Sequence, residues 1–438
     1  MELECPDGWE LVNLRELGEV NRGRSRHRPR YAEHLYGGPY PFIQTGDVKA
    51  SNGRVTSYAQ TYSEAGLAQS RLWPAGTMCI TIAANIAETG ILTFPACFPD
   101  SVVGFIAEPK KADVQFVEYM FRFMRSRIQH QATGSVQDNI NIETLDRLRF
   151  PIPPLAEQKA IAAVLGALDD KIELNRRMNA TLEAIARALF QSWFVDFDPV
   201  RAKLDCRKPE GMDAATAALF PGHLVESPLG HIPRGWEVRT IESVCKAVTR
   251  GVTPEYGAGT GRFIINQRVN RGFDLDWSSL KELSQGLEVP PERFAKRWDV
   301  LVNCLGEGTL GRTHLYKGVS DVYAVDQHMS ICRAEYPSGG AYIYQVLSGA
   351  DGQAKIESLK TGSTGMTMFN ISKLRTFEMV WPSSAVLAAY FKSVESLWLQ
   401  IANNDHQSRT LATLRDMLLP KLLSGELSVA DVSKTPPS

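Results

Sequence analysis

The chain has 438 residues, enough for two or three domains. Its composition, 44% hydrophobic and 22% charged, is typical of a soluble globular protein, and no apolar run approaches the roughly 20 residues of a membrane span. A formal net charge of −1 argues against broad, non-specific binding to nucleic acid, which relies on a basic surface, but leaves room for a local basic face.

Cysteine and histidine usage limits the chemistry further. The seven cysteines are scattered singly, with no CxxC pair, which predicts neither a disulfide framework nor a zinc site. The histidines show no metal-ligand spacing, so we expect no bound metal. The first residues are acidic and lack the apolar core of a secretory signal. These features predict a cytoplasmic protein without membrane association.

Residues 1–150 are predicted to form an α+β domain. Apolar runs bounded by Gly, Asn and Pro indicate strands at 42–44, 78–82 and 102–106, and a helix is expected over 114–131. The loop at 133–139 contains Ser135 and is a candidate for backbone contacts to phosphate.

A basic stretch lies early in this domain. It has no acidic residue and carries five arginines: Arg22, Arg24, Arg26, Arg28 and Arg30. Arginine matches phosphate oxygens and the guanine edge, so the stretch is a candidate DNA contact, more to phosphate than to base. A solvated loop is the alternative interpretation.

A long helix is predicted in the segment 151–195. Its apolar residues recur at alternating steps of four and three, the coiled-coil spacing, and Asn175 and Asn179 fall in the same register. A polar residue on such a seam costs stability but fixes register and partner number. The pair Asp169–Asp170 is expected on a solvated flank or a subunit contact. A seam this narrow needs another helix to cover it.

The second half repeats this order. Residues 196–227 are predicted to link the halves, 228–380 to form a second α+β domain, 381–427 a second long helix and 428–438 a tail. Strands are expected at 263–265, 300–305 and 328–332, and a weaker helical pattern covers 341–347. The GEGTLG motif at 306–311 is interpreted as a tight turn after a strand, because no helical pattern follows it.

The two halves are related by internal duplication. Pro-x-Gly-Trp-Glu at 6–10 recurs at 233–237, and Arg22-Gly23 recurs as Arg250-Gly251. An offset of 229 superposes the helix seams: Leu168 on Leu397, Ile172 on Ile401, Asn175 on Asn404, Leu182 on Leu411 and Leu189 on Leu418. Matching seams indicate that the two helices pair, whereas unrelated amphipathic core helices are the alternative.

Polar residues follow corresponding predicted strands in the two domains. They are Gln44, Thr45 and Asp47 in the first domain and Asn266, Gln267 and Arg268 in the second. Side chains of this kind can bind base edges, although loop polarity explains them equally well. Arg250, and Ser363 in the loop at 361–367, complete the candidate DNA contacts of the second domain.

The chain resembles the specificity subunit of type I restriction–modification systems over nearly its whole length. The resemblance is carried by PIPPLAEQKAI at 151–161, FQSWFVDFDPVRAK at 190–203, GHIPRGWE at 230–237 and LRDMLLPKLLSGEL at 414–427. The second helix departs from the pattern, because it begins with WPSSAVLAAYF in place of the PPLAEQ form.

This resemblance implies two target recognition domains that bind the halves of a bipartite DNA site. The long helices would pack antiparallel as a spacer and dock two modification (methyltransferase) subunits, and restriction subunits would complete the complex. The chain itself would have no catalytic activity and no cofactor; S-adenosylmethionine, ATP and Mg²⁺ are expected on the partners.

Two other classes of function are alternatives to this interpretation. A self-contained methyltransferase or nuclease is disfavoured because no [ND]PP[YF] motif occurs in the sequence. A duplicated helical scaffold that binds only protein stays open.

Overall fold

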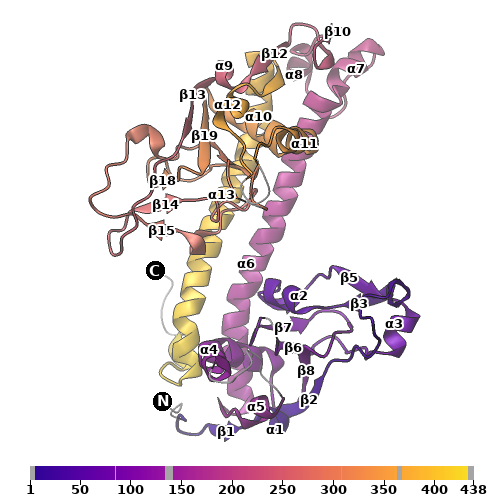
Figure 1. Ribbon diagram of the computed structural model, residues 1–438, viewed down its shortest axis with the longest axis vertical. Coiled ribbons are helices and arrows are strands. Elements are labelled where there is room, and N and C mark those ends of the chain that lie inside the picture. The colour runs from indigo at the N-terminus through magenta and orange to yellow at the C-terminus, as the bar shows by residue number, and fades with distance from the viewer. Residues whose placement is uncertain (1–4, 84, 134–141, 307, 363–366, 433–438) are drawn as a thin grey trace. The chain divides into compact units, whose positions relative to one another are not determined.

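The computed structural model describes residues 5–83, 85–133, 142–306, 308–362 and 367–432. The chain divides into two compact units. Unit 1 comprises Met1–Leu174 with Gln407–Ser438, and unit 2 comprises Asn175–His406. Each unit contains one lobe of strands and short helices and one part of each of the two long helices, α6 (Leu155–Phe190) and α13 (Ser384–Leu423) (Figure 1).

The unit 1 lobe is built on a five-stranded sheet in the order β2-β8-β6-β7-β4. Its strands are β2 (Gly18–Arg22), β8 (Val102–Ala107), β6 (Met78–Thr81), β7 (Thr89–Leu92) and β4 (Gly53–Val55). All pairs are antiparallel except β4–β7. Successive residues of β6 belong to different cores: Met78 and Ile80 join the cluster that includes α4 (Val114–Thr133), and Cys79 packs with Trp73. Both faces of the sheet are therefore covered.

The remaining unit 1 elements surround this sheet. The strands are β1 (Glu10–Val12) paired with β9 (Phe150–Ile152), and β3 (Tyr36–Phe42) paired with β5 (Gln60–Tyr62). The helices are α1 (Leu14–Leu17), η1 (Glu33–Leu35), α2 (Thr45–Ala50), α3 (Glu64–Ala68), α5 (Ile142–Arg147) and α14 (Val429–Val432).

The unit 2 lobe repeats the arrangement on a four-stranded antiparallel sheet, β13-β19-β16-β17. These strands are β13 (Cys245–Arg250), β19 (Met329–Ala334), β16 (Val300–Asn303) and β17 (Thr313–Leu315). Beside it, β14 (Phe263–Ile265) pairs antiparallel with β15 (Lys281–Glu282) and parallel with β18 (Tyr323–Val325). The GEGTLG segment connects β16 to β17, so a strand and not a helix follows it, as expected.

The other unit 2 elements complete the duplication. Strand β12 (Glu237–Thr240) pairs with β20 (Glu378–Trp381), as β1 pairs with β9, and β10 (Leu224–Ser227) pairs with β11 (Gly230–Pro233). The helices are α7 (Asp198–Leu204), α8 (Ala214–Ala218), α9 (Ile241–Val244), η3 (Trp277–Ser279), η4 (Pro291–Arg293), α10 (Pro337–Ser348), α11 (Ala350–Ser358) and α12 (Ile371–Arg375).

The segment 196–227, which the sequence analysis assigns as the link between the halves, contains regular structure. After α6 the chain makes a π-helical turn, Gln191–Val195, and continues into α7 and α8. Phe197, Val200 and Phe220 are buried in the main core of unit 2, together with Trp193 and Trp236. The segment is structured because its aromatic and branched residues complete that core.

The start of α6 explains part of the PPLAEQ motif. Gln158 is only 1% exposed. Its carboxamide oxygen accepts a hydrogen bond from the Asp113 N–H (2.9 Å), and its amide nitrogen donates to the carbonyls of Lys111 (3.0 Å) and Pro153 (2.9 Å). Gln158 therefore joins the first turn of the long helix to the loop that leads into α4.

Candidate functional site

In unit 1 the two sets of candidate residues lie beside one backbone segment. The Arg24 N–H donates to the Phe98 carbonyl (3.0 Å), and the Ile43 N–H donates to the Cys97 carbonyl (2.8 Å). Because Cys97 and Phe98 are consecutive, the basic stretch and the start of α2 are held at one edge of the lobe. We call Arg22–Arg30 together with Gln44–Asp47 the first edge cluster.

The five arginines of this cluster are all exposed but differ in their pairing. Arg30 donates two hydrogen bonds to the Asp100 carboxylate (3.1 and 3.0 Å), and Arg28 donates to the carbonyls of Ser25 (2.8 Å) and His27 (2.9 Å). In the part of the chain that the structure describes, the side chains of the other three make no hydrogen bond or ion pair: Arg22, Arg24 and Arg26. These three are the guanidinium groups available to a phosphate.

The polar residues at the start of α2 divide in the same way. The Asp47 carboxylate accepts the Gln44 N–H (2.8 Å) and so caps the helix, which leaves it a structural role. The Gln44 side chain donates to Gln60 (2.7 Å) and, like Thr45, is partly exposed. Gln44 and Thr45 are therefore better placed than Asp47 to contact a ligand.

Unit 2 brings its candidates together in the same manner. The Val252 N–H donates to the Val325 carbonyl (2.8 Å), and the next residue, Asp326, donates its N–H to the Ile265 carbonyl (2.9 Å). One segment thus lies between the end of β13 and the end of β14. We call Arg250 together with Asn266–Arg268 the second edge cluster.

Within the second edge cluster, the Asn266 side chain shapes a turn, whereas the side chains of Gln267 and Arg268 do not. The buried Asn266 side chain accepts the N–H groups of Arg268 (2.8 Å) and Val269 (3.3 Å), which forms a tight turn. Arg268 is exposed. The Gln267 carboxamide oxygen and the Arg250 Nε are each buried without a hydrogen-bond partner in the described chain. Buried polar atoms are normally satisfied, so both atoms are candidates for contact with a ligand.

Two residues that the sequence did not reveal hold this turn in place. Asn303 donates to the Gln267 carbonyl (3.0 Å), and Asn270 donates to the Asn303 side chain (3.0 Å). Both asparagines are fully buried. Asn303 lies within the predicted strand 300–305 and ends the observed β16, but nothing in a single sequence shows that its amide reaches residue 267. Ser135 and Ser363, the remaining candidates, lie outside the described residues.

The helix pair in unit 2 has polar residues at the centre of its seam. Asn404 donates to the Asn179 side chain (2.9 Å), Asn179 donates to Asp405 (2.6 Å), and Asn175 donates to the Asn404 carbonyl (3.4 Å). The seam position Ile401 is fully buried. These contacts join α6 to α13 through the asparagines.

The other seam positions are packed less evenly. In unit 2, Leu182, Leu189 and Leu397 are half-buried, whereas their neighbours Phe190 and Trp398 are buried. In unit 2 the long helices pack against the lobe as well as against each other, so the buried face of each helix is wider than the predicted seam. In unit 1, Ile172 is buried, and the half-buried seam positions are Leu168, Leu411 and Leu418.

In unit 1 the helices are joined by charge. Asp169 of α6 accepts hydrogen bonds from Arg415 Nη1 of α13 (2.6 Å) and from the Tyr119 hydroxyl of α4 (2.7 Å). Its side chain is 15% exposed. The expectation of a solvated flank is therefore wrong for Asp169, because the lobe and the second helix both cover it. Asp170 remains exposed and pairs with Arg54.

Comparison with known proteins agrees with the resemblance seen in the sequence. A family model described as "Type I restriction modification DNA specificity domain" matches residues 6–184. The type I restriction enzyme MjaIX specificity subunit of Methanocaldococcus jannaschii is 25% identical over 444 residues, covering 98% of this chain and 96% of that protein. The chain belongs to the family of type I restriction–modification specificity subunits.

A second relative and a solved structure are similar to this specificity subunit. The HindI specificity subunit of Haemophilus influenzae is 26% identical over 373 residues, which are 74% of this chain and 80% of the relative. The crystal structure of the type I S subunit from M. genitalium has a TM-score of 0.53 at 15% identity and covers 96% of this chain and 98% of that one. The latter similarity is one of fold.

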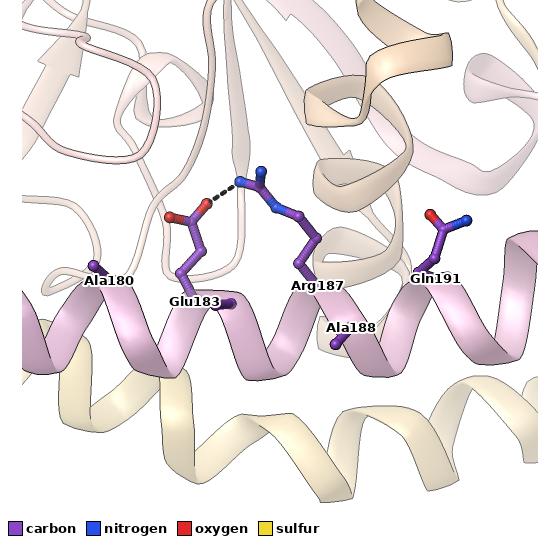
Figure 2. A pocket seen from close by; sticks show the side chains of 6 residues that line it. Ala180, Glu183, Arg187, Ala188 and Gln191 are labelled. Atoms are coloured by element: carbon purple, nitrogen blue, oxygen red, sulfur yellow. Dashed lines mark hydrogen bonds and ion pairs between the residues drawn. The ribbon is translucent and has the colours of Figure 1, made fainter. Parts of the chain in front are cut away.

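In unit 2 the specificity subunit exposes a face of α6 that is rich in alanine. Ala180, Ala184 and Ala188 recur every four residues and line a shallow hollow of about 420 Å³ together with Glu183, Arg187 and Gln191. Figure 2 shows the Glu183 carboxylate and the Arg187 guanidinium on one side of the helix, where they form an ion pair at 2.6 Å. Small side chains let another helix approach closely.

Two classes of structure are absent from the described ranges. No helix there combines the length and the apolarity needed to span a lipid bilayer. No group of three or more His, Cys, Asp or Glu side chains in those ranges could hold a metal ion.

Proposed function

We propose that this specificity subunit binds a bipartite DNA target, with the first edge cluster on one half-site and the second edge cluster on the other. As a specificity subunit the chain is a non-catalytic recognition subunit of a type I restriction–modification complex. The observation that supports the bipartite target is the repeated geometry, because in each lobe one backbone segment holds arginine and amide side chains close together.

The physical chemistry of DNA recognition agrees with two lobes that each bind one half-site. The major groove distinguishes all four base pairs by hydrogen-bond pattern, but one small lobe covers only a few of them. Two lobes add their discrimination, since mismatches at separate positions cost free energy roughly additively. In the first edge cluster, the unpaired arginines suit phosphate and Gln44 suits a base edge.

The partners are DNA and the other subunits of the complex. We propose that two modification subunits dock on the long helices and that restriction subunits complete the assembly in the cytoplasm. The exposed alanine face at Ala180, Ala184 and Ala188 fits a helix of such a subunit. S-adenosylmethionine, ATP and Mg²⁺ would enter with these partners.

The first test is to map methylated positions in the host genome by single-molecule sequencing, with and without the gene for this chain. We expect two short half-sites separated by a fixed gap, all of which disappear without the chain. Footprinting with and without the modification subunit separates a DNA reader from a protein scaffold. Incorporation of label from S-adenosylmethionine by the chain alone would instead support the enzyme alternative.

A second test concerns the gap between half-sites. Because a helix rises about 5.4 Å per turn, inserting one turn at matching positions of α6 and α13 should change the permitted gap. An unchanged gap would show that the helices do not set the spacing.

A further inference from the structure

In unit 1, helix α4 presents a row of polar side chains to the hairpin between β6 and β7 and to the turn after α2. Residues at steps of three and four along α4 contact the hairpin between β6 and β7. Glu118 accepts the Thr89 hydroxyl (2.9 Å), Arg125 pairs with Glu88 (3.0 Å), and Gln129 donates to the Ile86 carbonyl (2.9 Å). This face of α4 therefore holds the hairpin between β6 and β7 in place.

Arg122 occupies the centre of this row and points to three partners at once. Its Nε donates to Glu118 (2.7 Å), its Nη2 donates to the Asn52 carbonyl (2.6 Å), and its Nη1 lies 3.5 Å from Asp169. Glu118 is 2% exposed, and burial raises the pKa of its carboxyl, which the Arg122 charge opposes. The planar guanidinium alone has the donors to fill all three directions.

Asp169 extends the network to both long helices within unit 1. It accepts the Tyr119 hydroxyl and Arg415 Nη1, so α4, α6 and α13 meet at one carboxylate. Burial and the Asp169 charge raise the pKa of Tyr119, which keeps the phenol protonated as a donor. The network is largely shielded from water, which strengthens each of these bonds.

The Asn52 carbonyl belongs to the turn that ends α2. Asn52 and Gly53 both have positive φ, +48° and +93°, and a Cβ on Gly53 would lie only 1.6 Å from Arg122 Nη2. Glycine is therefore required for the arginine to reach the turn. The other end of α2, six residues long, carries Gln44 and Thr45 of the first edge cluster. A displacement of the turn would therefore move those side chains.

We propose that Arg122 is a positioning residue for base recognition in unit 1. It fixes α2, and with it Gln44 and Thr45, against the helix pair, although it is not itself placed at the first edge cluster. This inference rests on the proposed function of that cluster. Unit 2 offers an internal contrast, because Trp398 stands at the position that corresponds to Asp169 at the offset of 229 and packs edge-on against Tyr344 (ring centroids 5.6 Å apart).

The test uses the complex reconstituted with modification subunits and measures methylation of duplexes that carry single base changes in either half-site. The half-site of unit 1 is identified as the one where Arg24→Ala with Arg26→Ala weakens footprint protection. Arg122→Ala and Asp169→Asn should each lower the preference for the cognate over the altered half-site about tenfold there, and the double variant should lower it no further than either single one.

Two further variants separate positioning from folding. Arg127→Ala changes an exposed arginine on the same helix and should have no effect. Arg122→Lys keeps the charge near Glu118 but lacks the fork that also reaches Asn52. It should melt within a few degrees of the wild type while losing discrimination at the unit 1 half-site and keeping it at the other.

The outcomes distinguish this inference from the function on which it rests. Equal loss at both half-sites, or normal discrimination in Arg122→Ala, would overturn the positioning role. A wild-type complex that discriminates at neither half-site would overturn the proposed function itself.

Discussion

Replacing Asn404 with alanine should open the helix pair of unit 2 locally. Asn404 is 2% exposed and donates to Asn179, which is 5% exposed. The alanine leaves the buried Asn179 oxygen without a donor, at a cost of roughly 1–3 kcal/mol, and the vacated volume adds about 1 kcal/mol. Gln400, which donates to the Asn404 oxygen (2.8 Å), is exposed and can turn to water. The sum is about 2–4 kcal/mol.

Hydrogen exchange followed by mass spectrometry measures this free energy where it acts. Because about 1.4 kcal/mol is a factor of ten, backbone amides of α13 between residues 384 and 406 should exchange about 30- to 700-fold faster in Asn404→Ala. Peptides from residues 407–423, which belong to unit 1, serve as the internal control and should change much less.

A double variant tests the reason for this destabilisation. Asn179→Leu with Asn404→Leu removes donor and acceptor together, which is close to neutral when the shapes fit. Exchange should then return to within about tenfold of the wild type. Unchanged exchange in Asn404→Ala, or a double variant as labile as the single one, would refute the claim that an unmet buried hydrogen bond is what destabilises the pair.

Three further predictions concern other parts of the chain. Arg24→Ala with Arg26→Ala should reduce the log–log slope of DNA affinity against salt by about one unit for each phosphate that is no longer neutralised, whereas the internally paired Arg30→Ala should not, as fluorescence anisotropy will show. Gln158→Leu removes three hydrogen bonds of a buried side chain, to the backbone of Asp113, Lys111 and Pro153, and should lower the stability of unit 1 by about 2–4 kcal/mol in calorimetry. Burial lowers the pKa of Lys317 below its usual 10.5. Just below pH 10.5 the unfolded chain therefore binds more protons than the folded one, so unit 2 becomes more stable as the pH rises toward 10.5. Over that pH range the melting temperature of the wild type should rise relative to that of Lys317→Met.

The features that sequence predicted well are those set by local periodicity. The expected helix at 114–131 corresponds to α4, and the strand at 263–265 coincides with β14. The repeated seam located both long helices and placed Asn175 and Asn404 where they bond. Periodicity reports which face of an element is apolar, and one offset along the whole chain identified the duplication.

The features that sequence missed depend on interactions between distant residues. Arg30 looked equivalent to the other arginines until Asp100, seventy residues away, was found to pair with it. Asp169 looked solvated because its partners Tyr119 and Arg415 lie on other elements. Trp398 is buried more deeply than the predicted seam residue Leu397 because α13 packs against a lobe as well as α6. No single-sequence pattern encodes such pairings.

The buried strands of each lobe and the exposed members of the edge clusters differ in how freely they can be substituted. In each lobe, strand order is fixed by backbone hydrogen bonds and fully buried residues such as Ile80 and Val302, whose truncation would cost several kcal/mol. The exposed members of the edge clusters, such as Arg24, Arg26 and Arg268, make few internal interactions, and substitutions at such positions usually change stability by less than about 0.5 kcal/mol. The residues proposed to bind DNA can therefore vary independently in the two lobes, whereas Arg122 and Asn303, which hold the edges in place from within, cannot vary without displacing them.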